Sequence, residues 1–191
     1  SRSAFLMLIV TLIMFFTLIK RVRYLALFAV FFAVGIFFLP KDLQSEGVNL
    51  FRTASIIARS DEVNSAITII KGNWLFGVGF NAYRFVKRDY GFLKEEAWQN
   101  VHSGGGTDNS FLFVLATAGI FGFLSFMYLL YKMFSLGKTS FYKLGGDSKA
   151  LGLVLLCSVV GIGVNSLFLN SFFYPSITAW IFILAGLTEK E

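Results

Sequence analysis

Five apolar runs without a single charged residue constrain this chain more than any other feature. A helix needs about 20 residues, within a range of about 17–25, to cross the apolar core of a bilayer. Hydrophobic residues make up 56% of the 191 residues, against ~45–50% in soluble domains, and one small domain could not bury all five runs. The sequence therefore predicts an all-α integral membrane protein with five transmembrane helices. The runs are residues 4–19, 24–39, 109–131, 150–169 and 171–187.

Basic residues are concentrated in two short connectors between these runs. Residues 20–23 carry three of them, and residues 132–149 carry four against one acidic residue. The long segment 40–108, by contrast, balances eight basic residues against eight acidic ones. Because cytoplasmic loops are enriched in Lys and Arg, we expect both connectors in the cytoplasm and the long segment outside.

This topology predicts three parts and accounts for the net charge of +6. The excess charge then belongs to the connectors, so no nucleic-acid partner is expected and the lipid bilayer is the expected surroundings. The parts are residues 1–39 with two transmembrane helices joined by a cytoplasmic connector at 20–23, residues 40–108 as an extracytoplasmic loop, and residues 109–191 with three transmembrane helices and a cytoplasmic connector at 132–149.

The external loop is too long and too aromatic to be featureless. Apolar residues at helical spacing between positions 56 and 70 predict an amphipathic helix of about four turns, ending at Gly72. Lying on the membrane face, this helix would hold Arg59 at a defined position. Residues 73–79 are expected to form turns, residues 83–98 a further helix, and residues 102–107 a flexible link to Asp108.

Few residues in the sequence offer familiar catalytic chemistry. The chain has one His, His102, and one Cys, Cys157, which together cannot build a metal site. The sequence therefore predicts a metal-independent mechanism without a cofactor, or no catalysis at all. Asp108 stands at the mouth of the third apolar run, where a polar residue either caps the helix or carries out chemistry.

Four motifs in order give the chain a recognisable signature. Ser1-Arg2-Ser3-Ala4 precedes the first run, and Arg59 is followed by a helix and then Asn73-Trp74-Leu75-Phe76-Gly77-Val78-Gly79. A third motif has Asn109, Ser110 and Leu112, then Leu115-Ala116, and ends with Gly119, Ile120 and Gly122; a final pair of runs with a short turn completes the set. In this order the chain resembles the C-terminal half of the O-antigen ligase / O-antigen polymerase (Wzy-like) superfamily of bacterial envelope glycosyltransferases.

The resemblance implies a substrate and a location. The protein would polymerise or ligate oligosaccharides linked to polyprenyl diphosphate in the synthesis of O-antigen, capsule or exopolysaccharide, at the outer face of the cytoplasmic membrane. Its partners would be that lipid-linked glycan donor, a glycan acceptor, and an N-terminal half of the same protein that precedes Ser1. Asp108 stands where ligase-type members have His, which favours the polymerase-like members.

The resemblance also implies roles for individual residues, with alternatives that the sequence leaves open. Arg59 and Arg2 match family arginines and would bind the diphosphate, with Arg84 as a weaker candidate; each could instead be an exposed surface residue. Either Asp108 or His102 would take the proton of the acceptor hydroxyl. Asn109 would orient the base or bind sugar, although it could equally cap the helix.

One alternative from another functional class is a non-catalytic polysaccharide transport or channel component. Such a protein would be expected to carry charges within its membrane helices or helices broken at the middle of the membrane. The five runs here contain no charge, which favours the enzyme.

Overall fold

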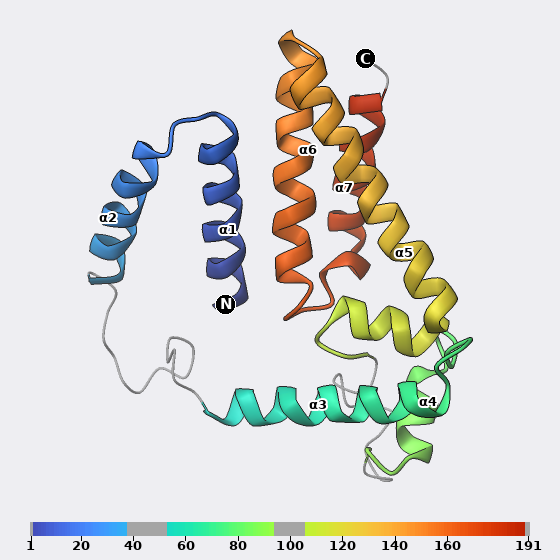
Figure 1. Ribbon diagram of the computed structural model, residues 1–191. Helices are drawn as coiled ribbons and strands as arrows, with labels where there is room; N and C mark the ends of the chain where they lie inside the picture. Colours follow the sequence, from blue (N-terminus) through green and yellow to red (C-terminus); the bar gives the residue numbers. More distant parts are fainter. Residues whose placement is uncertain (1, 38–52, 94–105, 190–191) are drawn as a thin grey trace.

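The computed structural model describes residues 2–37, 53–93 and 106–189, and its regular elements in these ranges are all helical (Figure 1). The expected all-α class is therefore confirmed for this part of the chain. The elements are α1 (Arg2–Leu18), α2 (Arg23–Phe37), α3 (Thr53–Gly72), α4 (Tyr83–Asp89), α5 (Ser110–Lys143), α6 (Gly146–Asn165), the short 3₁₀ helix η2 (Ser171–Phe173) and α7 (Pro175–Glu189).

Two helices within the described ranges are long and apolar enough to cross a membrane. They are α5, with 34 residues, and α6, with 20 residues. Two shorter apolar helices accompany them, at Ser3–Leu18 and Pro175–Glu189. The expected runs thus correspond to helices, but α5 extends to Lys143, well beyond the predicted end of its run at residue 131.

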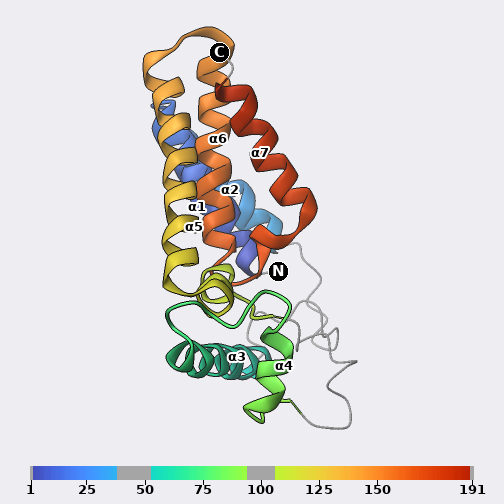
Figure 2. The same ribbon diagram turned by 90° about the vertical axis from the view of Figure 1, so that its right-hand side faces the viewer.

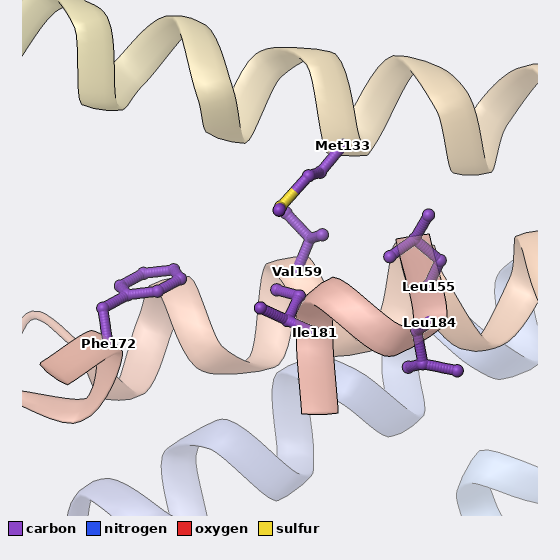
Figure 3. Packing of buried hydrophobic residues seen from close by; sticks show 6 residues of the cluster. All are labelled: Met133, Leu155, Val159, Phe172, Ile181 and Leu184. Carbon is purple, nitrogen blue, oxygen red and sulfur yellow. The ribbon is translucent and has the colours of Figure 1, made fainter. Parts of the chain in front are cut away.

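The helices of the bundle pack around α6. Helix α1 lies against one side of α6, while α5 and α7 lie against others (Figures 1 and 2). A cluster of buried apolar side chains joins α5, α6 and α7 (Figure 3). The close approach of α5 and α6 depends on Gly152, since a Cβ there would lie 2.6 Å from the Phe141 backbone nitrogen. The cluster consists of Met133, Leu155, Val159, Phe172, Ile181 and Leu184.

The α1–α2 and α5–α6 connections lie together at one end of the bundle, at the top in Figure 1, and α3 crosses the opposite end. The second connection is shorter than the predicted connector 132–149, because residues 132–143 belong to α5. Helix α3 and the two connections are thus at opposite ends of the bundle, while the cytoplasmic location of the basic segments stays a prediction.

Helix α3 confirms that the loop contains a helix, although Ile67, one of the apolar residues on which that prediction rested, is exposed. It has 20 residues and ends at Gly72, as expected, although it begins at Thr53, earlier than the apolar spacing indicated. It runs across the bundle end rather than along the bundle axis (Figure 1). Helix α4 confirms only the beginning of the helix expected at residues 83–98. It ends at Asp89, residues 90–93 are not helical, and residues 94–98 lie outside the described ranges.

Helix α5 is broken at Gly119, which the sequence did not predict. Gly119 has φ +64° and ψ −166°, a combination that only glycine adopts readily. The segment before it, Ser110 to Ala118, runs alongside α3 across the bundle end, whereas the rest of α5 follows the bundle (Figure 1). The missing Cβ of Gly119 makes room for the Leu75 carbonyl of the loop after α3.

The loop 74–79 fills this break and takes over its hydrogen bonds. The amides of Val78 and Gly79 donate to the carbonyls of Ala116 and Thr117 at 2.9 and 2.8 Å, and the Ile120 amide donates to the Trp74 carbonyl at 2.9 Å. A break in a helix leaves backbone groups that must find partners elsewhere. The loop supplies these partners, so the conformation of the loop and the break in α5 depend on each other.

Candidate active site

Asn109, and not Asp108, is the N-cap of α5. The Asn109 side-chain oxygen accepts hydrogen bonds from the Phe111 and Leu112 amides at 2.9 and 3.0 Å, as an N-cap does. Of the alternatives that the sequence left open, the cap is thus Asn109. The adjacent Asp108 carboxylate is 57% exposed.

The turn between α6 and α7 holds the first residues of α5 in place. The Asn109 amide group donates to the Leu167 carbonyl at 3.1 Å. The fully buried Ser110 donates its backbone N–H to the Ser166 carbonyl at 2.9 Å and its hydroxyl to the Leu169 carbonyl at 3.3 Å. These bonds connect positions more than 50 residues apart in sequence and fix the location of Asp108.

A second buried cluster fixes α3 against the same segment of α5. Ile69 of α3, Tyr83 of α4, and Phe113 and Ala116 of α5 are all buried and in contact. These contacts fix the position of α3 relative to α5, so the earlier turns of α3 lie near the start of α5. Arg59 on α3 therefore comes close to Asp108.

A cavity of about 550 Å³ opens where these segments meet. Its walls come from the first turns of α1, the middle of α3, the residues before α5 and the turn after α6. Polar and apolar groups are mixed in the lining, a common composition for a ligand site. The lining residues are Ser3, Leu6, Arg59, Ser60, Glu62, Val63, Asn64, Thr107, Asp108, Asn109, Leu167 and Phe168.

Arg59 and Asp108 face each other in this cavity. The Arg59 Nε lies 3.9 Å from an Asp108 carboxylate oxygen, and the two side chains are 41% and 57% exposed. An exposed pair at this separation contributes about 0–1 kcal/mol to stability. The fold, rather than their mutual attraction, keeps these two charges together, and both remain accessible to a ligand.

A tighter ion pair, between Lys87 and Glu62, lies next to the cavity, and its Glu62 side chain is part of the cavity lining. The Lys87 ammonium lies 2.6 Å from each oxygen of the Glu62 carboxylate, and the Lys87 side chain is only 2% exposed. Burial, with a smaller contribution from Glu62, raises the pKa of the adjacent Tyr83 phenol well above its usual range. Glu62 thus stands between a buried cation and the cavity that it lines.

The other predicted site residues have different positions. Arg2 opens α1 directly before Ser3, which lines the cavity, but the Arg2 side chain lies outside the described part of the structure. His102 also lies outside the described ranges. Arg84 is in the first turn of α4 and does not belong to the cavity lining. Asn109 lines the cavity while its amide caps α5.

Among the described residues, no group of three His, Cys, Asp or Glu side chains is arranged to hold a metal ion. The side chains that line the described cavity offer one guanidinium, two carboxylates, two amides and three hydroxyls. A guanidinium suits an oxyanion such as phosphate, and a carboxylate can accept a proton or bind hydroxyl groups.

A family model described as O-antigen ligase matches residues 1–127. The chain belongs to the O-antigen ligase family. The match covers α1 to α4 and the broken part of α5, and thus all the cavity walls except the turn after α6. Comparisons with curated proteins and with solved structures gave no significant match. Membership of the O-antigen ligase family implies a membrane protein that ligates or polymerises polysaccharide and uses lipid-linked glycans.

Sequence reasoning missed several polar residues that this O-antigen ligase family member places in the cavity wall. Glu62 could have been recognised, because a residue three positions after Arg59 shares its helix face. Asn64 and Thr107 gave no such signal. The burial of Lys87 against Glu62 depends on α4 packing on α3, which no local pattern predicted.

Proposed function

We propose that the protein is a metal-independent membrane glycosyltransferase that polymerises or ligates oligosaccharide carried on polyprenyl diphosphate. In this proposal α1, α2, α5, α6 and α7 are the five membrane helices, and α3 lies on the outer face of the bacterial cytoplasmic membrane. The observation that carries the proposal is the accessible Arg59–Asp108 pair in a cavity at the end of the bundle. Family membership supplies the substrate class.

The proposed reaction joins an acceptor hydroxyl to the first sugar of the donor. Arg59, assisted by Arg2, binds the diphosphate and stabilises its charge as it leaves. The acceptor oxygen bonds to the anomeric carbon, the bond from that carbon to the phosphate oxygen breaks, and the electron pair leaves with the polyprenyl diphosphate. Asp108 takes the hydroxyl proton. Asn109 supports Asp108 by fixing the start of α5.

Asp108 is the stronger candidate for the base because the capping task belongs to Asn109. The transport alternative is less well supported. The charged cavity residues lie at one end of the bundle, where α3 crosses it (Figure 1), whereas a transport pathway would need polar groups along its length.

Complementation in a strain lacking the gene tests the proposal. We expect Arg59→Ala to abolish polymer, and Arg59→Lys to restore little because it loses bidentate phosphate binding. Lys71→Ala is a matched control, since Lys71 is an exposed cation in the last turn of the same helix and does not line the cavity. Gel profiles of surface polysaccharide and immunoblots of protein level are the measurements. Normal polymer length with Arg59→Ala at normal protein level would contradict the proposal.

The same strains distinguish the two activities. A polymerase defect leaves single repeat units on the lipid carrier, whereas a ligase defect leaves full-length polymer on the carrier without its final acceptor. Asp108 in place of His favours the first outcome, and the lipid-linked fraction should then contain only short glycan.

A further inference from the structure

Only one of the charged side chains that line the described cavity is suited to binding a diphosphate. Arg59 is the cavity's one described cation, while Glu62 and Asp108 contribute two carboxylates. Carboxylates repel phosphate groups but accept hydrogen bonds from neutral hydroxyls. The wall that contains Glu62 therefore matches a different part of the substrates from the part that Arg59 matches.

Glu62 is held in a position from which it can bind hydroxyls. The two short contacts from Lys87 fix the position of its carboxylate. A carboxylate has about four acceptor positions, so this pairing leaves others available, and the Glu62 side chain is 21% exposed where it lines the cavity. Charge-assisted hydrogen bonds of this kind are stronger than neutral ones.

Thr107 adds an independent sign that a ligand belongs here. The residue is 3% exposed and lines the cavity, and its hydroxyl has no hydrogen-bond partner within the described structure. A buried hydroxyl without a partner is costly and uncommon. Asn64, also in the lining, is exposed and carries both donors and an acceptor.

We propose that Glu62, Asn64 and Thr107 form a glycan subsite that binds sugar hydroxyls beside the diphosphate-binding Arg59. The apolar lining from Val63, Leu167 and Phe168 provides contact for the C–H faces of a sugar ring. This inference rests on the proposed function, because it assigns one substrate to one wall of the same cavity. Lys87 is a positioning residue that acts through Glu62.

Binding measurements on the complete gene product in lipid nanodiscs test the subsite. Two probes are used: inorganic diphosphate, and the lipid-free repeat unit released by mild acid from the lipid-linked glycan of the producing cells. Because Glu62→Gln alone would leave the buried Lys87 without its carboxylate partner, the main variant is Glu62→Gln with Lys87→Met. Thr107→Val removes the hydroxyl at nearly constant shape. Asp61→Asn changes the neighbouring exposed carboxylate, which does not line the cavity.

We expect the double variant to raise the glycan Kd about tenfold or more, and Thr107→Val about fivefold. The diphosphate Kd should stay unchanged, since the double variant removes one negative and one positive charge and keeps Arg59, and Asp61→Asn should alter neither Kd. Unchanged glycan binding in both variants would overturn the inference, as would an equal loss of diphosphate binding or failure of the unmodified protein to bind glycan. A failure of the proposed function is seen separately, as normal polymer in Arg59→Ala cells.

The source of the bound sugar is resolved by repeating the titration with donor lipid already bound. Retained glycan binding assigns the subsite to the acceptor, while competition assigns it to the sugar of the donor. Either result supports a glycan subsite at this wall.

Discussion

The break in α5 gives the sharpest structural prediction, through Gly119→Ala. An added Cβ would overlap the Leu75 carbonyl, and the backbone of Gly119 has a conformation that alanine strongly disfavours. The substituted chain can relieve this conflict by making α5 continuous. Ile120 would then donate within its own helix and the loop 74–79 would be displaced.

The expected cost follows from the bonds that the loop loses. The Trp74 carbonyl and the Val78 and Gly79 amides each take part in one hydrogen bond to α5, and a net loss of about 1 kcal/mol per bond gives about 3 kcal/mol. This loss, about 3 kcal/mol, would lower the unfolding temperature on the order of 10 °C. Displacement of the loop would also move Asp108 away from Arg59 and reduce glycan transfer.

Thermal unfolding and hydrogen exchange in nanodiscs measure these effects. Gly163→Ala serves as the control, because Gly163 is a helical glycine with open space at its Cβ position and alanine there should be neutral or slightly stabilising. We expect Gly119→Ala to expose the Val78 and Gly79 amides to exchange. An unchanged unfolding temperature together with full protection of these two amides would refute the reasoning.

Three further predictions concern stability and are measured by thermal unfolding. Tyr83→Phe should be neutral or stabilising near neutral pH, since the buried Tyr83 hydroxyl has no hydrogen-bond partner within the described residues. Folding raises the pKa of the Tyr83 phenol, so the wild type should lose stability as the pH rises above about 10, where the phenol of the unfolded chain ionises. Tyr83→Phe should lose less stability over this range, and parallel pH profiles of the two proteins would contradict this. Asn109→Ala should lower the free energy of unfolding by about 1–2 kcal/mol because the cap is lost. Asn109→Asp should have a stability between those of the wild type and Asn109→Ala, because it keeps the cap acceptor but loses the hydrogen bond to the Leu167 carbonyl. Equal stability of all three proteins would argue against the cap. Gly152→Leu should force α5 and α6 apart and lower the unfolding temperature by several degrees, whereas Gly163→Leu should not, and similar losses in both would contradict the close approach.

The sequence predicted those features that depend on local pattern. Apolar runs indicated the bundle helices, and helical spacing with Gly72 indicated α3 and its end. The position of the basic connectors at one end of the bundle followed from charge alone. Arg59 was predicted as a site residue because it matches a family arginine, and Asp108 because it stands where ligase-type members have His; neither signal indicated that the two side chains would lie close together.

The remaining features depend on contacts between distant segments. Gly119 in an apolar run looks the same whether it packs against a helix or breaks one, and the loop 74–79 that occupies the break begins 45 residues earlier in the chain. Likewise, the burial of Lys87 requires α4 to fold back on α3. Residue types alone could not indicate that Glu62 would face the cavity with a buried cation behind it.

The most direct test of the account is the rate of a single round of glycan transfer by the purified complete protein with its lipid-linked donor. We predict that Asp108→Asn lowers this rate at least ~100-fold with an unchanged unfolding temperature, because the carboxylate is exposed and does not cap α5, and that His102→Ala stays within a few fold of wild type. A wild-type rate for Asp108→Asn, with the loss in His102→Ala instead, would contradict Asp108 as the base.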